Sequence, residues 1–168
     1  DDVALLVYAG HGARWKAAGA FTTYFPDGYD EGFVCYNSRS KPDAYDLGDK
    51  EIALLLKEVE RNNPHIAVIL DCCHSGSATR GAAEVEGALI RATLTMEDER
   101  PLESYLHSDT LRIEYAGALK RGELAIPKTK HILLAACDRT QSAHEEKRRG
   151  LFSYSLQQVF TQHGVDLS

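Results

Sequence analysis

The chain has 168 residues, of which 43% are hydrophobic and 26% charged, and its net charge is −6 with a pI near 5.6. These values are typical of one globular domain with a sizeable core, and they exclude a largely disordered chain. The basic residues are scattered apart from residues 147–149 and no apolar run reaches the roughly 18 residues of a membrane span, so we expect neither nucleic acid nor membrane as a partner.

Three short apolar runs are predicted to be buried strands. They cover residues 3–8, 66–70 and 131–136, and each ends abruptly in polar residues. Because the first run stands at the very start of the sequence, with no signal peptide before it, we expect the chain to be a piece of a longer protein.

Helical periodicity predicts two helices. Residues 49–61 place four aliphatic side chains on one face, with Asp49 as a plausible N-cap, and a second helix is expected around residues 152–162. Strands that alternate with helices predict an α/β fold with a mostly parallel sheet. In such folds, functional sites gather beyond the carboxyl ends of the strands.

Two segments have weaker patterns. Residues 13–42 are rich in turn formers and are predicted to be loops above the sheet, with a short strand at residues 33–36. Residues 81–130 are too long for a structureless loop in a compact domain, so we expect either partly helical and stranded structure or a functional insertion. The alternating residues 111–115 predict a short edge strand there.

The most reactive cluster is the sequence Asp71-Cys72-Cys73-His74 at the end of the strand 66–70. If strand alternation continues to this point, Asp71 and Cys73 share one face and Cys72 points to the other, toward the core. Adjacent cysteines cannot easily bridge each other, and zinc ligands are usually more widely spaced, so neither a disulfide framework nor a zinc site is expected. The cysteine usage favours a reducing, cytoplasmic location.

A thiol with the reference pKa of about 8.5 is only a few per cent ionised at neutral pH and needs a base to attack a carbonyl group. His11 follows the first strand between two glycines, and an imidazole can deprotonate a thiol and later protonate a leaving amine. The residues alone leave a second interpretation open, in which His11 is only part of a glycine-rich turn. His74 is a weaker candidate because it points away from the face of Cys73.

The sequence Tyr8-Ala9-Gly10-His11-Gly12, followed by residues 71–76, resembles the catalytic histidine and cysteine boxes of the caspase-like cysteine peptidases, in particular the metacaspase and bacterial orthocaspase branch. The resemblance extends through residues 27–31, 46–51 and 136–145. It implies a caspase-like (caspase-hemoglobinase) fold, with a mostly parallel central sheet between helical layers in a three-layer α/β/α arrangement.

By this resemblance Cys73 is the nucleophile, His11 is the general acid/base, and the backbone N–H groups of Gly12 and Cys73 form the oxyanion hole. Each such preorganised donor stabilises the transition state by roughly 3 kcal/mol.

The resemblance also implies that Asp71, with Ala9 and Asp138, lines the pocket for the substrate residue before the scissile bond. A carboxylate in that pocket predicts Arg or Lys in the protein or peptide substrate. The family usually has an acid one position after Asp138, where this chain has Arg139. The alternative for Asp71 is a residue that only ties down its loop.

Calcium is the one cofactor that the resemblance suggests. Asp30 and Asp49 match acids of calcium-dependent metacaspases, but further acids of that pattern are replaced by Lys50 and Arg80. Two carboxylates beside cations make a poor site for an ion that takes six to eight oxygens. We therefore expect no cofactor, no metal ligand set and no tight calcium requirement.

The expected organisation is one catalytic domain over residues 1–168, with a part similar to the large caspase subunit (1–80), a linker (81–130) and a part similar to the small subunit (131–168). We expect a cysteine endopeptidase that cuts after Arg or Lys through a thioester. Self-cleavage is expected in the linker, with four candidate sites, Arg91, Arg100, Lys120 and Arg121. The alternative is a caspase-fold scaffold or signalling module with little activity, acting with fused signalling or repeat domains outside this chain.

Overall fold

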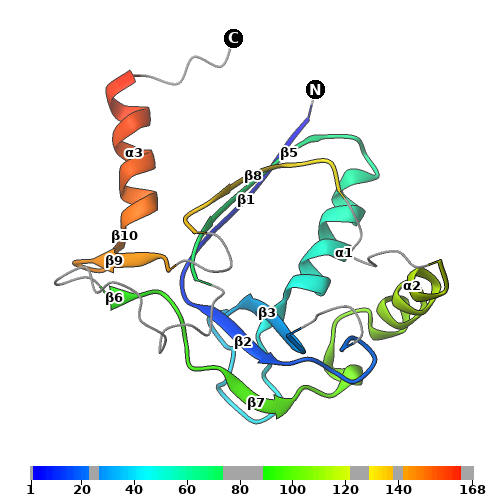
Figure 1. The fold of residues 1–168 in the computed structure, drawn as a ribbon. Coiled ribbons are helices and arrows are strands. Elements are labelled where there is room, and N and C mark those ends of the chain that lie inside the picture. The colour runs from blue at the N-terminus through cyan, green and yellow to red at the C-terminus, as the bar shows by residue number, and fades with distance from the viewer. Residues whose placement is uncertain (1, 23–26, 74–88, 122–128, 138–141, 164–168) are drawn as a thin grey trace.

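The computed structural model describes residues 2–22, 27–73, 89–121, 129–137 and 142–163, and it has a mixed α/β architecture (Figure 1). Its parallel sheet contains β1 (Val3–Ala9), β5 (His65–Asp71) and β8 (Ile132–Ala135), in the order β1-β5-β8. Ala9 lies opposite Asp71, and all three strands run in the same direction. The three predicted strands and the α/β fold class are therefore confirmed, and the strands end at the same edge of the sheet.

Both predicted helices are present as α1 (Asp49–Glu60) and α3 (Leu151–His163). The apolar face of α1 lines a shared groove with β1, which explains the helical spacing of its aliphatic residues. Asp49 is not the N-cap as predicted. Gly48 takes that position, and its N–H donates to the carboxylate of Glu51 at 2.6 Å. The acid that secures the start of the helix is thus in its first turn.

A second, four-stranded sheet contains β2 (Gly12–Lys16), β3 (Tyr29–Phe33), β4 (Leu47–Gly48) and β7 (Met96–Glu99). The prediction of loops over residues 13–42 is therefore wrong where β2 and β3 form. The predicted strand at residues 33–36 is wrong because β3 ends at Phe33. Strand β3 carries two acids and a glycine, which gives it little strand propensity. Its position depends on long-range pairing with β2 and β4.

The described part of the predicted linker is partly stranded and partly helical. This was one of the two structures expected for residues 81–130. It contains β6 (Leu89–Ile90), β7, the 3-10 helix η2 (Leu102–Ser104) and α2 (Ser108–Arg121). The predicted edge strand at residues 111–115 is wrong, because these residues belong to α2. Five alternating residues also fit a helix in which Leu111 is buried and Ile113 is exposed.

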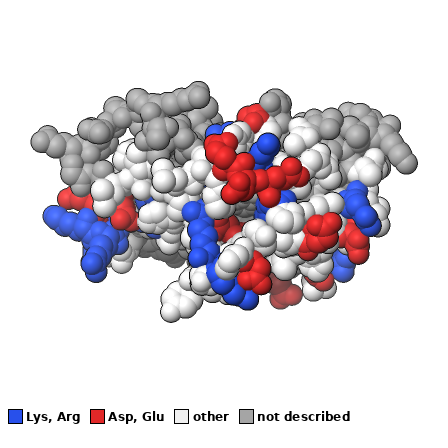
Figure 2. All heavy atoms as spheres, turned by 90° about the horizontal axis from the view of Figure 1, so that it is seen from below, with Lys and Arg blue, Asp and Glu red and all other residues white. Residues whose placement is uncertain are grey.

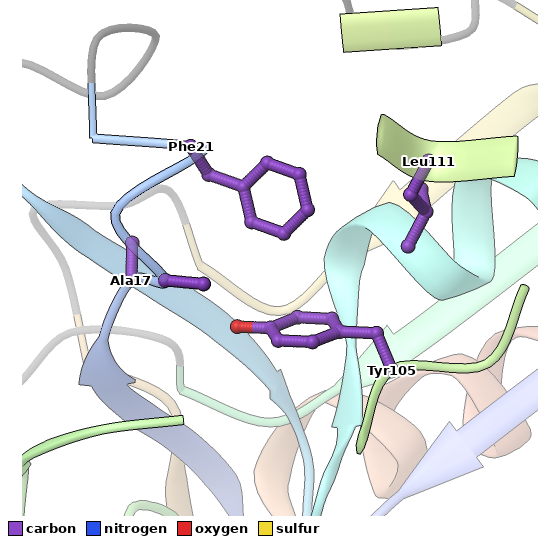
Figure 3. Packing of buried hydrophobic residues seen from close by; sticks show 5 residues of the cluster. Ala17, Phe21, Tyr105 and Leu111 are labelled. Carbon is purple, nitrogen blue, oxygen red and sulfur yellow. The ribbon is translucent and has the colours of Figure 1, made fainter. Parts of the chain in front are cut away.

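The linker packs against the rest of the chain through a small apolar cluster (Figure 3). Its buried members are Ala17, Ala18, Phe21, Tyr105 and Leu111. The rings of Phe21 and Tyr105 meet edge to face with centroids 5.3 Å apart, a favourable geometry for aromatic pairs. This cluster joins the end of β2 to η2 and α2, so the linker is part of the folded unit rather than a free loop.

One side of the parallel sheet is more exposed than a buried strand predicts. Val3, Leu5 and Val7 of β1 are 72%, 61% and 54% exposed, whereas Ala4 and Leu6 are half-buried between them. The alternation shows that β1 is covered mainly from one side, and all four residues of β8 are exposed. The prediction of buried strands is therefore only half right for β1 and wrong for β8.

The face of the molecule nearest β7 carries mixed charge. Lys and Arg side chains are interspersed there with Asp and Glu side chains (Figure 2). None of the helices in the described part of the chain is long and apolar enough to cross a membrane.

The third sheet brings residues distant in sequence to the end of β5. Its strands are β6, β9 (His144–Glu146) and β10 (Arg149–Gly150), in the antiparallel order β10-β9-β6. The residue after β6 is Arg91, and its N–H donates to the carbonyl oxygen of Ala143, just before β9, at 3.0 Å. The linker thereby reaches the edge of the parallel sheet where the predicted site residues lie.

Candidate active site

The histidine and cysteine boxes lie side by side at the carboxyl ends of β1 and β5. Asp71 is the last residue of β5 and Cys73 follows it, and their exposed fractions are 1% and 0%. The N–H of Gly10 donates to the carbonyl oxygen of Asp71 at 3.2 Å. The parallel pairing of the two strands thus places the segment that contains His11 next to the segment that contains Cys73.

Two backbone N–H groups converge on one oxygen atom in this site. The N–H of Gly12 and the N–H of Cys73 both donate to the carbonyl oxygen of Arg91, at 3.0 and 3.1 Å. They are the two groups that the resemblance predicts for the oxyanion hole. Two donors at this spacing can stabilise negative charge that develops on a carbonyl oxygen.

The side chain of Arg91 is buried against carboxylates. Its Nε lies 3.8 Å from Oδ1 of Asp71, and its Nη1 lies 3.5 Å from Oε2 of Glu145. Nε also donates to the carbonyl oxygen of Gly10 at 3.3 Å. Arg91 is 6% exposed, so the guanidinium occupies a pocket with acids on two sides.

The Asp71 carboxylate is held in place by the start of α3. The N–H of Ser153 donates to Oδ2 of Asp71 at 2.9 Å, while Oδ1 accepts no hydrogen bond. A side chain at position 150 would leave no room for the Asp71 carboxylate and the Arg91 guanidinium. A Cβ added to Gly150 would collide with the Asp71 carboxylate and lie 2.6 Å from Nη1 of Arg91.

Two residues of this pocket were not predicted from the sequence. One is Glu145, although it lies in the stretch that carries the family resemblance and follows His144 directly. Gly150 gave no recognisable signal in the sequence. Of the predicted pocket residues, Ala9 lies opposite Asp71 in the strand register. Asp138, like His74 and Arg80, lies outside the described residues.

The Cys73 thiol forms hydrogen bonds with the backbone of Ala143. Its sulfur accepts a hydrogen bond from the N–H of Ala143 at 2.6 Å and donates to the carbonyl oxygen of Ala143 at 3.2 Å. A hydrogen bond from the thiol of Cys137, together with backbone donors, lowers the pKa of Cys73 to about 7, although burial opposes this shift. A pKa near 7 leaves a large fraction of the thiol ionised at neutral pH.

The neighbouring thiol behaves differently. Burial, followed by the charges of Cys73 and Asp71, raises the pKa of Cys72 to about 12. Both cysteines are buried, so exposure does not distinguish them. Their acidity separates them, because only Cys73 can supply a thiolate near neutral pH.

His11 is held through its backbone. Its carbonyl oxygen accepts hydrogen bonds from the Tyr8 hydroxyl at 2.8 Å and from the N–H of Val34 at 3.1 Å, and its side chain is exposed. Within the described residues, no hydrogen bond joins the His11 ring to the Cys73 thiol. In this arrangement, the thiol interacts with Ala143 instead.

The two weak calcium candidates already share one cation of the chain. The ammonium group of Lys50 contacts the carboxylate of the fully buried Asp30 and lies 3.4 Å from Asp49. The Tyr105 hydroxyl donates to the other Asp30 oxygen at 2.6 Å. These residues therefore do not fit a calcium ion. The described segments contain no group of three or more His, Cys, Asp or Glu residues that could hold a metal.

Comparison with known proteins agrees with this geometry. A family model described as the caspase domain matches residues 1–168. No curated protein and no solved structure matches the chain. With the match spanning the whole sequence and a mostly parallel sheet flanked by helices, the chain belongs to the caspase domain family of cysteine peptidases.

Proposed function

We propose that the protein is an endopeptidase of the metacaspase and orthocaspase type that cuts peptide bonds after Arg or Lys. The observation that carries this proposal is the position of Arg91. Its carbonyl oxygen receives two N–H donors and its guanidinium lies beside Asp71 and Glu145. An arginine residue of a substrate would place its scissile carbonyl and its charge in the same way.

In the proposed mechanism, the Cys73 thiolate attacks the carbonyl carbon of the substrate arginine and forms a tetrahedral intermediate. The N–H groups of Gly12 and Cys73 hold the resulting oxyanion and contribute about 3 kcal/mol each. His11 protonates the leaving amine as the carbon–nitrogen bond breaks, which leaves a thioester. Water, activated by His11, then hydrolyses the thioester and regenerates the thiol.

Charge and shape support the preference for basic residues. A pair of unit charges about 4 Å apart is worth about 4 kcal/mol at an effective dielectric constant of 20, and Asp71 is 1% exposed. A guanidinium can contact Asp71 and Glu145 through different nitrogens, whereas an ammonium is a single point of charge. We therefore propose that Arg is cleaved faster than Lys.

We also propose that activity needs no calcium. The support is the Lys50 ammonium, which supplies positive charge to Asp30 and Asp49 from within the chain. Adding a chelator should leave the rate of peptide hydrolysis unchanged.

The second candidate function is a scaffold or signalling module with little activity. It is favoured by the complete burial of Cys73 beneath the Arg91 segment. Hydrolysis of fluorogenic peptides that end in Leu-Ile-Arg, Leu-Ile-Lys or Leu-Ile-Asp separates the two functions. An endopeptidase cleaves the Arg and Lys peptides and loses this activity in Cys73→Ala, whereas a scaffold cleaves none of them.

A further inference from the structure

We propose that Arg39 and Gly12 form a binding site for the second residue after the scissile bond of a substrate, and that this site selects a hydroxyl side chain, that of Ser or Thr. This inference rests on the proposed function and adds a specificity on the far side of the bond that is cut. It follows from the contacts that residues 91–93 form around Gly12.

Residues 91–93 show how a peptide lies along Gly12. The N–H of Gly12 donates to the carbonyl oxygen of Arg91 at 3.0 Å, and the carbonyl oxygen of Gly12 accepts a hydrogen bond from the N–H of Thr93 at 3.0 Å. Ala92, between them, forms a parallel bridge with Gly12. Main-chain pairing of this kind fixes the register of an extended peptide. A substrate whose arginine carbonyl takes the position of the Arg91 carbonyl therefore places its second following residue at the position of Thr93.

The Thr93 hydroxyl is satisfied both as a donor and as an acceptor. It donates to the Gly12 carbonyl oxygen at 3.3 Å and accepts a hydrogen bond from Nη2 of Arg39 at 3.0 Å. A hydroxyl group can do both at once, whereas an ionised carboxylate can only accept. A carboxylate would also place negative charge against the Gly12 carbonyl oxygen, and an aliphatic side chain would leave both groups without this partner. The chemistry of the site therefore favours Ser and Thr.

The Arg39 guanidinium is held by an acid of the chain. Its Nε and Nη2 donate to Oδ2 of Asp46 at 2.9 and 2.7 Å. The Asp46 side chain is 1% exposed, whereas that of Arg39 is 32% exposed. The planar guanidinium is thus fixed on one side by a buried carboxylate and is open to a ligand on the other, an arrangement that reduces the cost of ordering it on binding.

The backbone at Arg39 has the geometry of a functional position. Its φ is +61°, in the left-handed region that is uncommon for a residue with a Cβ atom. Its N–H donates to the carbonyl oxygen of Ala44 at 2.6 Å, which closes the loop that carries it. Backbone strain of this kind is concentrated at ligand sites and active sites. The loop holds Arg39 beside the position of Thr93.

The site is connected to the proposed chemistry through Gly12. The residue whose N–H is proposed to hold the oxyanion also accepts two hydrogen bonds from Thr93, one from its N–H and one from its hydroxyl. Glycine has more backbone freedom than any other residue, so these contacts help to hold the Gly12 N–H in place. We therefore expect the preference for a hydroxyl to appear in kcat/KM.

The test compares internally quenched peptides that differ at one position. Each contains Leu-Ile-Arg-Ala, followed by Thr, Val or Asp. Thr and Val have nearly the same shape, so their comparison isolates the hydroxyl. The wild type should cleave the Thr peptide with a kcat/KM at least about tenfold above that of the Val peptide, and at least about fivefold above that of the Asp peptide. All three peptides have to displace residues 91–93 from the same contacts, so this step cancels in the ratios.

Arg39→Met should lower the ratio of Thr to Val to less than about 3, because the charged donor is lost. A merely structural role of Arg39 would lower both rates and leave the ratio unchanged. Arg14→Met removes another arginine that pairs with an acid, Asp27, at 3.0 Å, and it should keep the wild-type ratio. If Arg39→Met does not fold, judged by its thermal transition, Arg39→Lys takes its place, since an ammonium can pair with Asp46 but lacks the planar fork that also donates to the hydroxyl.

A wild-type ratio of Thr to Val near 1 would overturn the proposal, and so would a ratio that the Arg39 variant leaves unchanged. An Asp peptide that is cleaved faster than the Thr peptide would overturn the hydroxyl assigned to the site. The fluorogenic peptide that ends in Leu-Ile-Arg has no second residue after its scissile bond. If no form hydrolyses this peptide in a way that depends on Cys73, the proposed function itself fails, so the two failures are distinguishable.

Discussion

The carbonyl oxygen of Arg91 accepts a 3.1 Å hydrogen bond from the backbone N–H of Cys73. The two residues are brought together by different strands, since Cys73 follows β5 and Arg91 follows β6. A distance near 3 Å from a preorganised donor is what stabilisation of an oxyanion requires. The contact therefore links the position of the linker to the chemistry proposed for the cysteine.

Asp71→Asn should reduce kcat/KM for a Leu-Ile-Arg peptide. The charge interaction is worth between about 1 and 4 kcal/mol, which corresponds to a loss of roughly 5-fold to 1000-fold. Steady-state hydrolysis measures this loss, and Asp43→Asn, which removes an exposed acid that pairs with Lys41, is the control. A peptide with uncharged citrulline in place of arginine should be hardly affected. Equal losses on both peptides would contradict the role of charge.

Gly150→Ala should also impair hydrolysis of Arg peptides. The new methyl group would overlap the Asp71 carboxylate and the space of the guanidinium. Overpacking typically costs about 1–3 kcal/mol, so kcat/KM should fall by roughly 5-fold to 150-fold. In Gly19→Ala, the added Cβ would have an ordinary 3.6 Å contact with Glu99, and this variant should behave like the wild type. If both variants retain full activity, position 150 does not limit the pocket.

Cys137→Ala should shift the pH dependence of Cys73 reactivity. The hydrogen bond from Cys137 lowers the pKa of Cys73 to about 7, and the thiolate is the reactive form. Without that donor the pKa rises toward its usual value of about 8.5, and the acidic limb of the profile moves up by roughly one pH unit.

The measurement for this prediction is the rate of Cys73 alkylation between pH 5 and pH 9, followed by peptide mass spectrometry. It is best made in the Arg91→Gln background, where the thiol is expected to be accessible. Cys35→Ala removes a cysteine outside the site and should leave the profile in place. An unchanged profile in Cys137→Ala would refute the assigned cause of the lowered pKa.

Lys50→Met should destabilise the fold strongly. The fully buried Lys50 neutralises Asp30, and loss of one partner from a buried ion pair typically costs about 3–5 kcal/mol. Urea unfolding measures the free energy of unfolding. Lys57→Met removes an exposed lysine 4.0 Å from Glu114 and should change it by less than about 0.5 kcal/mol. Equal stability of the two variants would show that the Asp30 carboxylate does not need this ammonium.

The sequence predicted the parallel sheet well because its three strands are short apolar runs with polar ends, and α1 and α3 because their apolar residues repeat at helical spacing. It failed at β3 and at residues 111–115. Strand β3 contains Asp30, an acid whose burial depends on Lys50 and Tyr105 from elsewhere in the chain. Residues 111–115 alternate like a strand but belong to α2, where Leu111 is buried and Ile113 is exposed.

The proximity of Asp71 and Cys73 followed from their order on one strand, but the other half of the pocket did not. Glu145 reaches Arg91, and Gly150 reaches Asp71, only through the pairing of β6, β9 and β10, which are two or three residues long. Strands this short have no periodicity that a sequence pattern can reveal. The place of Arg91 between the Gly12 and Cys73 N–H groups depends on the same pairings.

The most direct test of the central claim is the ratio of kcat/KM for Leu-Ile-Arg and Leu-Ile-Asp fluorogenic peptides, measured on the purified protein with Cys73→Ala as the blank. The Asp71 and Glu145 carboxylates predict hydrolysis of the Arg peptide, a ratio of at least about 100, and no activity in the blank. A preference for the Asp peptide, or hydrolysis that persists in Cys73→Ala, would contradict the claim.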